Sequence, residues 1–114
     1  MPEDSIFCKI RDGQIPTPKL FENDKVFAIN DINPVAPTHI LIIPKLSKAN
    51  IDSYSISELD IIASMFEVAK QIIHEKRLDN GYRLVINSGK NGGQTVDHLH
   101  MHLLAGREFS WPPG

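Results

Sequence analysis

Three of the chain's five histidines, His98, His100 and His102, stand two residues apart. Side chains alternate between the two faces of a β-strand, so this spacing predicts three imidazoles on one face and the intervening apolar residues in the core. Same-face neighbours lie roughly 6.5–7 Å apart along a strand, which suits a phosphate group held between imidazoles. A neutral imidazole can attack phosphorus and form a phosphohistidine. The spacing therefore indicates nucleophilic chemistry on a phosphate.

Metal binding is the second chemistry that a histidine cluster supports. His39 begins an apolar stretch and is a fourth imidazole candidate for the same site, with a capped strand end as the alternative interpretation. Three strand imidazoles together with His39 could hold zinc. No cysteine accompanies the cluster, and the one adjoining carboxylate, Asp97, is predicted to point to the opposite face. The spacing alone leaves the zinc alternative open.

The segment that leads into the histidines, residues 88–95, is rich in glycine. Such a loop can turn several backbone N–H groups toward an anion without side-chain crowding. It is not a Walker loop, because no Gly-Lys-Ser/Thr sequence follows. Its position directly before the histidine strand makes it a candidate for the second half of a phosphate site.

Short strands separated by turn signals are predicted to carry this site. The predicted strands are residues 20–21, 26–29, 38–43, 82–87 and 98–104. A short N-terminal helix is predicted through Ile6 and Ile10, with Asp4 or Ser5 as its cap and Gly13 at its end. This order of elements favours an α+β fold in which a helix packs on an antiparallel sheet.

One long helix is predicted over residues 56–77, because Ser55 and Glu58 match a capping box before an apolar run. One apolar stripe comprises Leu59, Ile62, Ala63, Phe66, Ala69 and Ile73. A second apolar set comprises Ile61, Met65, Val68 and Ile72. A helix that is apolar on more than one face needs more than its own sheet to cover it, so we expect a symmetric homodimer. The strand over residues 82–87 could pair with its copy and remove an exposed edge.

Composition and charge predict a single domain over residues 1–114 that binds neither nucleic acid nor a membrane. The net charge is -2 and the pI about 6.2, so the basic balance of a nucleic-acid binder is absent. No run approaches the ~18 apolar residues that a membrane span needs, and the N-terminus has no apolar signal core. The single cysteine, Cys8, excludes an intrachain disulfide and fits a buried apolar role in a reducing compartment. We expect a cytoplasmic protein that is small enough to reach the nucleus.

Motifs along most of the chain form a recognisable set. Residues 98–104 read His-φ-His-φ-His-φ-φ, in which φ is an apolar residue. The further motifs are Asp31-Ile32-Asn33-Pro34, Ala36-Pro37-Thr38-His39, Ile43-Pro44-Lys45, Gly92-Gly93-Gln94 and Trp111-Pro112-Pro113-Gly114. Over residues 5–114 the chain thereby resembles the histidine-triad superfamily and, within it, the branch of histidine-triad nucleotide-binding proteins.

This resemblance implies a purine nucleoside phosphoramidase that converts adenosine 5′-phosphoramidate to AMP and an amine, with no metal or other cofactor. His100 would be the nucleophile on the α-phosphorus, and the backbone carbonyl of His98 would hold its tautomer. His102 would contact the phosphate and help to protonate the leaving group, with His39 in the same catalytic group. The implied phosphate contacts are Asn87, Gly93, Gln94 and Thr95. The implied nucleoside contacts are Asp31 for the ribose hydroxyls and Ile15, Ile29 and Ile32 for the base.

The chain departs from this family pattern at three positions. Thr95 stands where serine is common, and Asn30 and Asp97 stand where a histidine and a tyrosine are familiar. We expect these changes to affect substrate preference rather than the reaction. The resemblance also implies that Trp111 lies beside the partner subunit's nucleotide pocket. A nucleotide-binding interaction protein of the kinase C-interacting type is the alternative function, together with zinc binding by the histidines.

Overall fold

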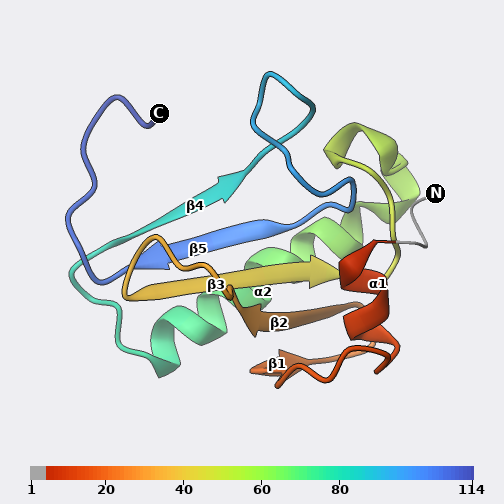
Figure 1. Cartoon of the computed structure of the whole chain (residues 1–114), viewed down its shortest axis with the longest axis horizontal. Helices are drawn as coiled ribbons and strands as arrows, with labels where there is room; N and C mark the ends of the chain where they lie inside the picture. The colour runs from red at the N-terminus through yellow and green to blue at the C-terminus, as the bar shows by residue number, and fades with distance from the viewer. Residues whose placement is uncertain (1–4) are drawn as a thin grey trace.

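The structure, a computed structural model, describes residues 5–114 as one five-stranded antiparallel sheet with two α-helices (Figure 1). The strands are β1 (Phe21–Glu22), β2 (Val26–Asn30), β3 (Thr38–Pro44), β4 (Tyr82–Ile86) and β5 (Met101–Ala105). The helices are α1 (Ile6–Arg11) and α2 (Leu59–Glu75), with the 3-10 helices η2 (Ile51–Ser53) and η3 (Ile56–Glu58) before α2. The predicted α+β class is confirmed, and β1 to β4 lie within one residue of their predicted bounds.

The sheet has the strand order β1-β2-β3-β5-β4, so β3 and β5 lie side by side at its centre and β4 is an outer strand (Figure 1). In the register of β3 with β5, Leu41 pairs with His102 and His39 pairs with Leu104. Side chains two residues apart share a face, so His39 and His102 lie diagonally across one face of the sheet. This register brings together two histidines that are far apart in the chain.

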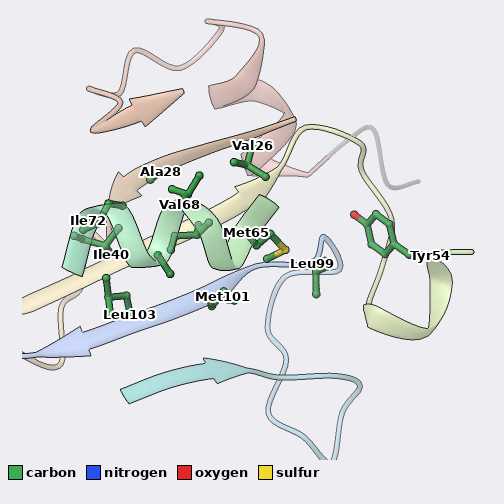
Figure 2. Packing of buried hydrophobic residues seen from close by; sticks show 12 residues of the cluster. Val26, Ala28, Ile40, Tyr54, Met65, Val68, Ile72, Leu99, Met101 and Leu103 are labelled. Carbon is green, nitrogen blue, oxygen red and sulfur yellow. The ribbon is translucent and has the colours of Figure 1, made fainter. Parts of the chain in front are cut away.

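Helix α2 covers one face of the sheet and builds the main core there. Met65, Val68 and Ile72 of α2 pack with Ile40 of β3 and Met101 of β5, all at most 4% exposed (Figure 2). The helix therefore packs on the sheet through the second apolar set of its sequence, Ile61, Met65, Val68 and Ile72.

The other stripe of α2 is divided between the core and the surface. Ala69 is buried in the core and Ile62 and Ile73 pack against it, while Leu59 is 47% exposed and Phe66 45% exposed. The helix therefore has exposed apolar groups beside the face that packs on the sheet. Both stripes have helical spacing, and only the shape of the sheet selects between them.

Helix α1 lies on the opposite face of the sheet, where it forms a smaller apolar layer. Phe7 and Ile10 pack against Phe27, Leu41 and other buried residues of β2 and β3. The side chain of Ser5 accepts a hydrogen bond from the backbone N–H of Cys8 at 3.1 Å, which confirms Ser5 as the helix cap. The alternative cap, Asp4, lies outside the described residues.

Strand β5 begins three residues later than predicted. Residues 98–100 approach it as irregular chain, and the N–H of Leu99 donates to the backbone oxygen of Lys48 at 2.9 Å rather than to a strand. The alternation of faces nevertheless holds, because Leu99 lies in the α2 core while His98 and His100 contact Phe7 on the α1 side. Within residues 5–114, no helix is long and apolar enough to span a bilayer.

Candidate active site

A cavity of about 480 Å³ opens on the α1 side of the sheet. It has a predominantly apolar wall from α1 and β2, and a polar end at the histidines. Of the thirteen site residues predicted from the sequence, eight line it: Ile15, Ile29, Asp31, Ile32, His39, Thr95, His100 and His102. Five others do not: Asn87, Gly93, Gln94, His98 and Trp111. The structure thus brings an apolar wall and a cluster of imidazoles into one cavity.

His100 is held in one tautomer by the main chain. Its Nδ1 lies 2.8 Å from the backbone oxygen of His98, and a carbonyl can only accept, so Nδ1 carries the ring proton. The ring is 5% exposed, with the edge of Phe7 against it at a centroid distance of 5.0 Å. Burial lowers the pKa of His100 below its ordinary value, despite the opposing effect of the hydrogen bond to His98. His100 is therefore neutral at pH 7, with the lone pair of Nε2 available for attack.

His39 and His102 form a chain of hydrogen bonds that begins at a peptide group. The N–H of Val35 donates to Nδ1 of His39 at 3.2 Å, so His39 carries its proton on Nε2. That Nε2 lies 2.9 Å from Nδ1 of His102, which must then be the acceptor. Burial, together with the neighbouring rings of His100 and His39, lowers the pKa of His102 to about 4. His102 is thus neutral and has its remaining N–H at Nε2.

His98 is fully buried and lies behind the cavity rather than in it. Its Nε2 donates to the backbone oxygen of Pro44 at 2.8 Å, so its Nδ1 is an acceptor. The hydroxyl of Ser5 donates to that Nδ1 at 2.8 Å and the hydroxyl of Ser47 lies 3.3 Å away. These contacts connect the start of α1 and the end of β3 to the chain just before β5. They thereby fix the position of the His98 carbonyl, which bonds to His100.

Asp31 follows β2 and places a carboxylate at the polar end of the cavity. Its Oδ1 accepts from the N–H of Asn33 at 2.8 Å, and its Oδ2 lies 3.4 Å from Nε2 of His39. The side chain remains 19% exposed. A carboxylate fixed at one oxygen and open at the other can accept hydrogen bonds from hydroxyl groups of a ligand.

Hydrogen bonds of the Gln94 side chain hold the glycine-rich loop, residues 88–95, in its closed shape. The Gln94 side chain donates from Nε2 to the oxygens of Ala49 (2.6 Å) and Val96 (2.9 Å), and accepts at Oε1 from the N–H of Gly89. Its own N–H donates to the oxygen of Gly89. These bonds give Gln94 the role of shaping the loop, and its contact with phosphate stays a prediction. Loop closure through a side-chain amide leaves no periodic signal in a sequence.

Asp31, His39 and His102 are the described residues that come nearest to a metal-ligand set, with one possible ligand atom each within 4.8 Å of the others. Their hydrogen bonds do not fit a resident zinc ion. His39 carries its proton on Nε2, the atom it would offer to the metal, because Val35 occupies Nδ1. The 2.9 Å between Nε2 of His39 and Nδ1 of His102 is also shorter than the roughly 3.3 Å between two ligands of a tetrahedral zinc.

Sequence reasoning missed two parts of the site. Ile6, Phe7 and Ile10 of α1 line the cavity, although their apolar spacing indicated only a core helix. Val35 also lines it, and its N–H sets the tautomer of His39. The place of α1 in the cavity could have been inferred from the sequence, because its apolar residues lie close to Ile15, a predicted site residue. The role of the Val35 N–H could not, because every residue except proline has such a group.

The chain is similar to known proteins over most of its length. Residues 12–109 match the HIT domain family. The chain is 46% identical to a "14 kDa zinc-binding protein" of Zea mays, with 96% of this chain and 88% of the relative covered. It is 43% identical to "Adenylylsulfatase HINT1" of Arabidopsis thaliana, with 99% and 80% covered. The crystal structure of a HIT family hydrolase from Legionella pneumophila Philadelphia 1 is similar at a TM-score of 0.93 and 44% identity, with 97% and 100% covered.

The family match covers most of the chain, and the relatives align with nearly its whole length. The histidine motif and most residues that line the cavity lie inside the matched region, while Ile6, Phe7 and Ile10 of α1 precede it. The chain therefore belongs to the HIT family and, within it, to the branch of histidine-triad nucleotide-binding proteins.

Proposed function

We propose that this chain is a nucleotide hydrolase that cleaves the P–N bond of purine nucleoside phosphoramidates to give AMP and an amine. The observation that carries the proposal is the proton arrangement of two rings in one cavity. His100 has a lone pair at Nε2 because its Nδ1 is bonded to the His98 oxygen, and His102 has an N–H at Nε2. A nucleophile beside a proton donor is what substitution at phosphorus with a poor leaving group requires.

The reaction follows in two steps. Nε2 of His100 attacks the α-phosphorus and forms an N–P bond, while the P–N bond to the amine breaks with its electron pair going to nitrogen. Nε2–H of His102 donates a hydrogen bond to the departing nitrogen, which takes a proton from solvent and leaves as the amine. Water then attacks phosphorus and gives a proton to solvent, the bond to His100 breaks with its electron pair returning to Nε2, and AMP leaves. Asp31 accepts from the ribose hydroxyls, and Ile15 and Ile29 contact the base.

Zinc binding is not the function that this geometry favours. The maize relative is named a zinc-binding protein, but in this chain a proton lies between the two imidazoles of the nearest ligand set, where a metal would bind. The proposed reaction needs no metal, because the chain's own rings supply the nucleophile and the proton donor.

A fluorogenic adenosine phosphoramidate tests the proposed activity directly. We expect release of the amine with AMP as the second product, and an acid-labile AMP adduct on His100 when the reaction is quenched early. A protein that acts only as a binding module would bind AMP and leave the substrate intact. An adduct on His98 or His39 would contradict the assigned roles.

The pH dependence of kcat/KM tests the protonation of the nucleophile. The pKa of His100 is lowered from 6.5 by burial, and only the neutral ring attacks. The rate should therefore be constant near neutral pH and decline only as the pH falls below 6.5. Initial rates at low substrate concentration measure this limb, and a midpoint above 6.5 would contradict the assignment.

We also propose that the chain forms a symmetric homodimer. Trp111 is 82% exposed, β4 is an outer strand, and Leu59 and Phe66 leave apolar surface open on α2. Pairing of β4 with its copy would remove an edge, and a partner would cover exposed apolar groups. Sedimentation equilibrium at micromolar concentration should give twice the chain mass, and a monomer there would contradict the proposal.

The Trp111→Ala variant should then change selectivity among leaving groups while the dimer persists.

A further inference from the structure

Val35, in the connection between β2 and β3, uses both of its peptide groups in contacts with distant parts of the chain. Its N–H donates to Nδ1 of His39 at 3.2 Å. Its carbonyl accepts from Nε of Arg107 at 2.9 Å. Arg107 does not line the cavity, yet it holds the Val35–Ala36 peptide, which directly follows the peptide whose N–H sets the tautomer of a ring in the cavity.

Arg107 is itself fixed by the segment that follows β5. Its guanidinium lies 4.3 Å from the centroid of the Phe109 ring, and Arg83 of β4 lies 5.1 Å from that centroid. Arg83 also donates to the oxygen of Ser110 at 2.9 Å. Stacking on an aromatic face and a forked set of donors suit arginine and not lysine. We call Arg83, Arg107 and Phe109 the tail clamp.

Close packing of two loops brings Arg107 within reach of Val35. Gly106 has φ +96, and a Cβ at this position would lie 2.8 Å from Cβ of Pro37. The turn after β5 is therefore in direct contact with the β2–β3 connection. A glycine is needed here both for the positive φ and for the missing side chain.

These contacts form one path from the tail clamp to the leaving-group side of the cavity. Arg107 holds the Val35 carbonyl, and the Val35 N–H keeps the proton of His39 on Nε2. That Nε2–H then donates to Nδ1 of His102, which leaves the proton of His102 on Nε2. If the N–H of Val35 moved away from Nδ1 of His39, the proton of that ring could move to Nδ1. His102 would then lose the Nε2–H of His39 that donates to its Nδ1.

We propose that Arg107, held in the tail clamp, is a positioning residue that keeps His102 in the proton-donating tautomer through Val35 and His39. This inference rests on the proposed function only for its kinetic consequence. Its structural consequence, the tautomers of two rings, is independent of any substrate.

Nitrogen NMR of isotope-labelled histidines tests that structural consequence, because it separates Nδ1–H from Nε2–H rings. In the wild type, and in the exposed-charge control Lys70→Ala, we expect His39 and His102 protonated on Nε2. In Arg107→Ala we expect a mixture of tautomers on these rings, and Arg107→Lys should restore part of the ordered state. Unchanged tautomers in a folded Arg107→Ala protein would overturn the proposal.

Two substrates with different leaving groups test the kinetic consequence. An amine must gain a proton to leave, whereas the sulfate of an adenylyl sulfate leaves as a stable anion. For Arg107→Ala we expect kcat/KM to fall at least about tenfold on the phosphoramidate and less than about twofold on the adenylyl sulfate. Equal losses on both substrates would mean a general structural defect and would overturn the proposal.

Two further outcomes are distinguishable by design. If Arg107→Ala does not fold, Phe109→Leu removes the ring beneath the guanidinium while it keeps Arg107, and the same split between substrates is expected at smaller size. If the wild type hydrolyses neither substrate, the proposed function fails, and the tautomer measurement still decides this inference.

Discussion

Replacing His100 by alanine should lower kcat/KM for an adenosine phosphoramidate by at least about a thousandfold. In the proposed reaction this ring supplies the attacking lone pair. No other described ring in the cavity has an unprotonated nitrogen that is not already bonded, because Nδ1 of His39 accepts from Val35 and Nδ1 of His102 faces His39. Steady-state rates with the purified variant measure the loss. AMP binding, measured by calorimetry, should be largely kept, because the apolar wall and Asp31 are untouched.

His74→Ala is the matched control for this substitution. His74 is exposed in the last turn of α2, away from the cavity, so its removal should leave the rate unchanged. An alanine variant at position 100 that retains more than about a tenth of the wild-type rate would contradict the assignment of the nucleophile.

Gly92→Ala should reduce kcat/KM by about a hundredfold. A Cβ on Gly92 would lie 2.4 Å from the backbone oxygen of Ser88 and 3.0 Å from its nitrogen, and neither backbone atom can move without opening the loop. The loop leads directly to Thr95 and Val96, which line the cavity beside the imidazoles. A displacement of about 1 Å in a group that positions a substrate has an effect of this size.

The control for the loop is Asn91→Ala, an exposed neighbour in the same turn. It should keep both the rate and the melting temperature. The Gly92→Ala protein should keep its fold, as seen by circular dichroism, because the loop lies outside the two apolar cores. Full activity in that variant would show that the loop does not position the substrate.

The sequence was most informative where side-chain alternation decides the structure. The period of two at the triad predicted that His98, His100 and His102 share a face, and this holds although β5 starts only at Met101. It could not predict that His98 turns its ring away from the cavity, because that depends on acceptors and donors from Pro44 and Ser5 that are distant in the chain.

Long-range register decided the remaining parts of the site. His39 was compatible with a strand end or with a fourth imidazole, and the pairing of Leu41 with His102 selects the second. The face of α2 that packs on the sheet was likewise open, because two stripes have the same period and differ only in the surface that meets them. The role of Gln94 depends on a carbonyl at Ala49, which no local pattern relates to the loop.

Peptide groups set the tautomers of two rings in the cavity: the carbonyl of His98 that of His100, and the N–H of Val35 that of His39. Nearly every amino acid has these groups, so a change of side chain at position 35 would leave the N–H in place. Proline is the exception, because it has no N–H to donate. We therefore expect position 35, which is 59% exposed, to accept other residues without a change of tautomer and to exclude proline. A deep mutational survey should show proline as the most depleted residue there.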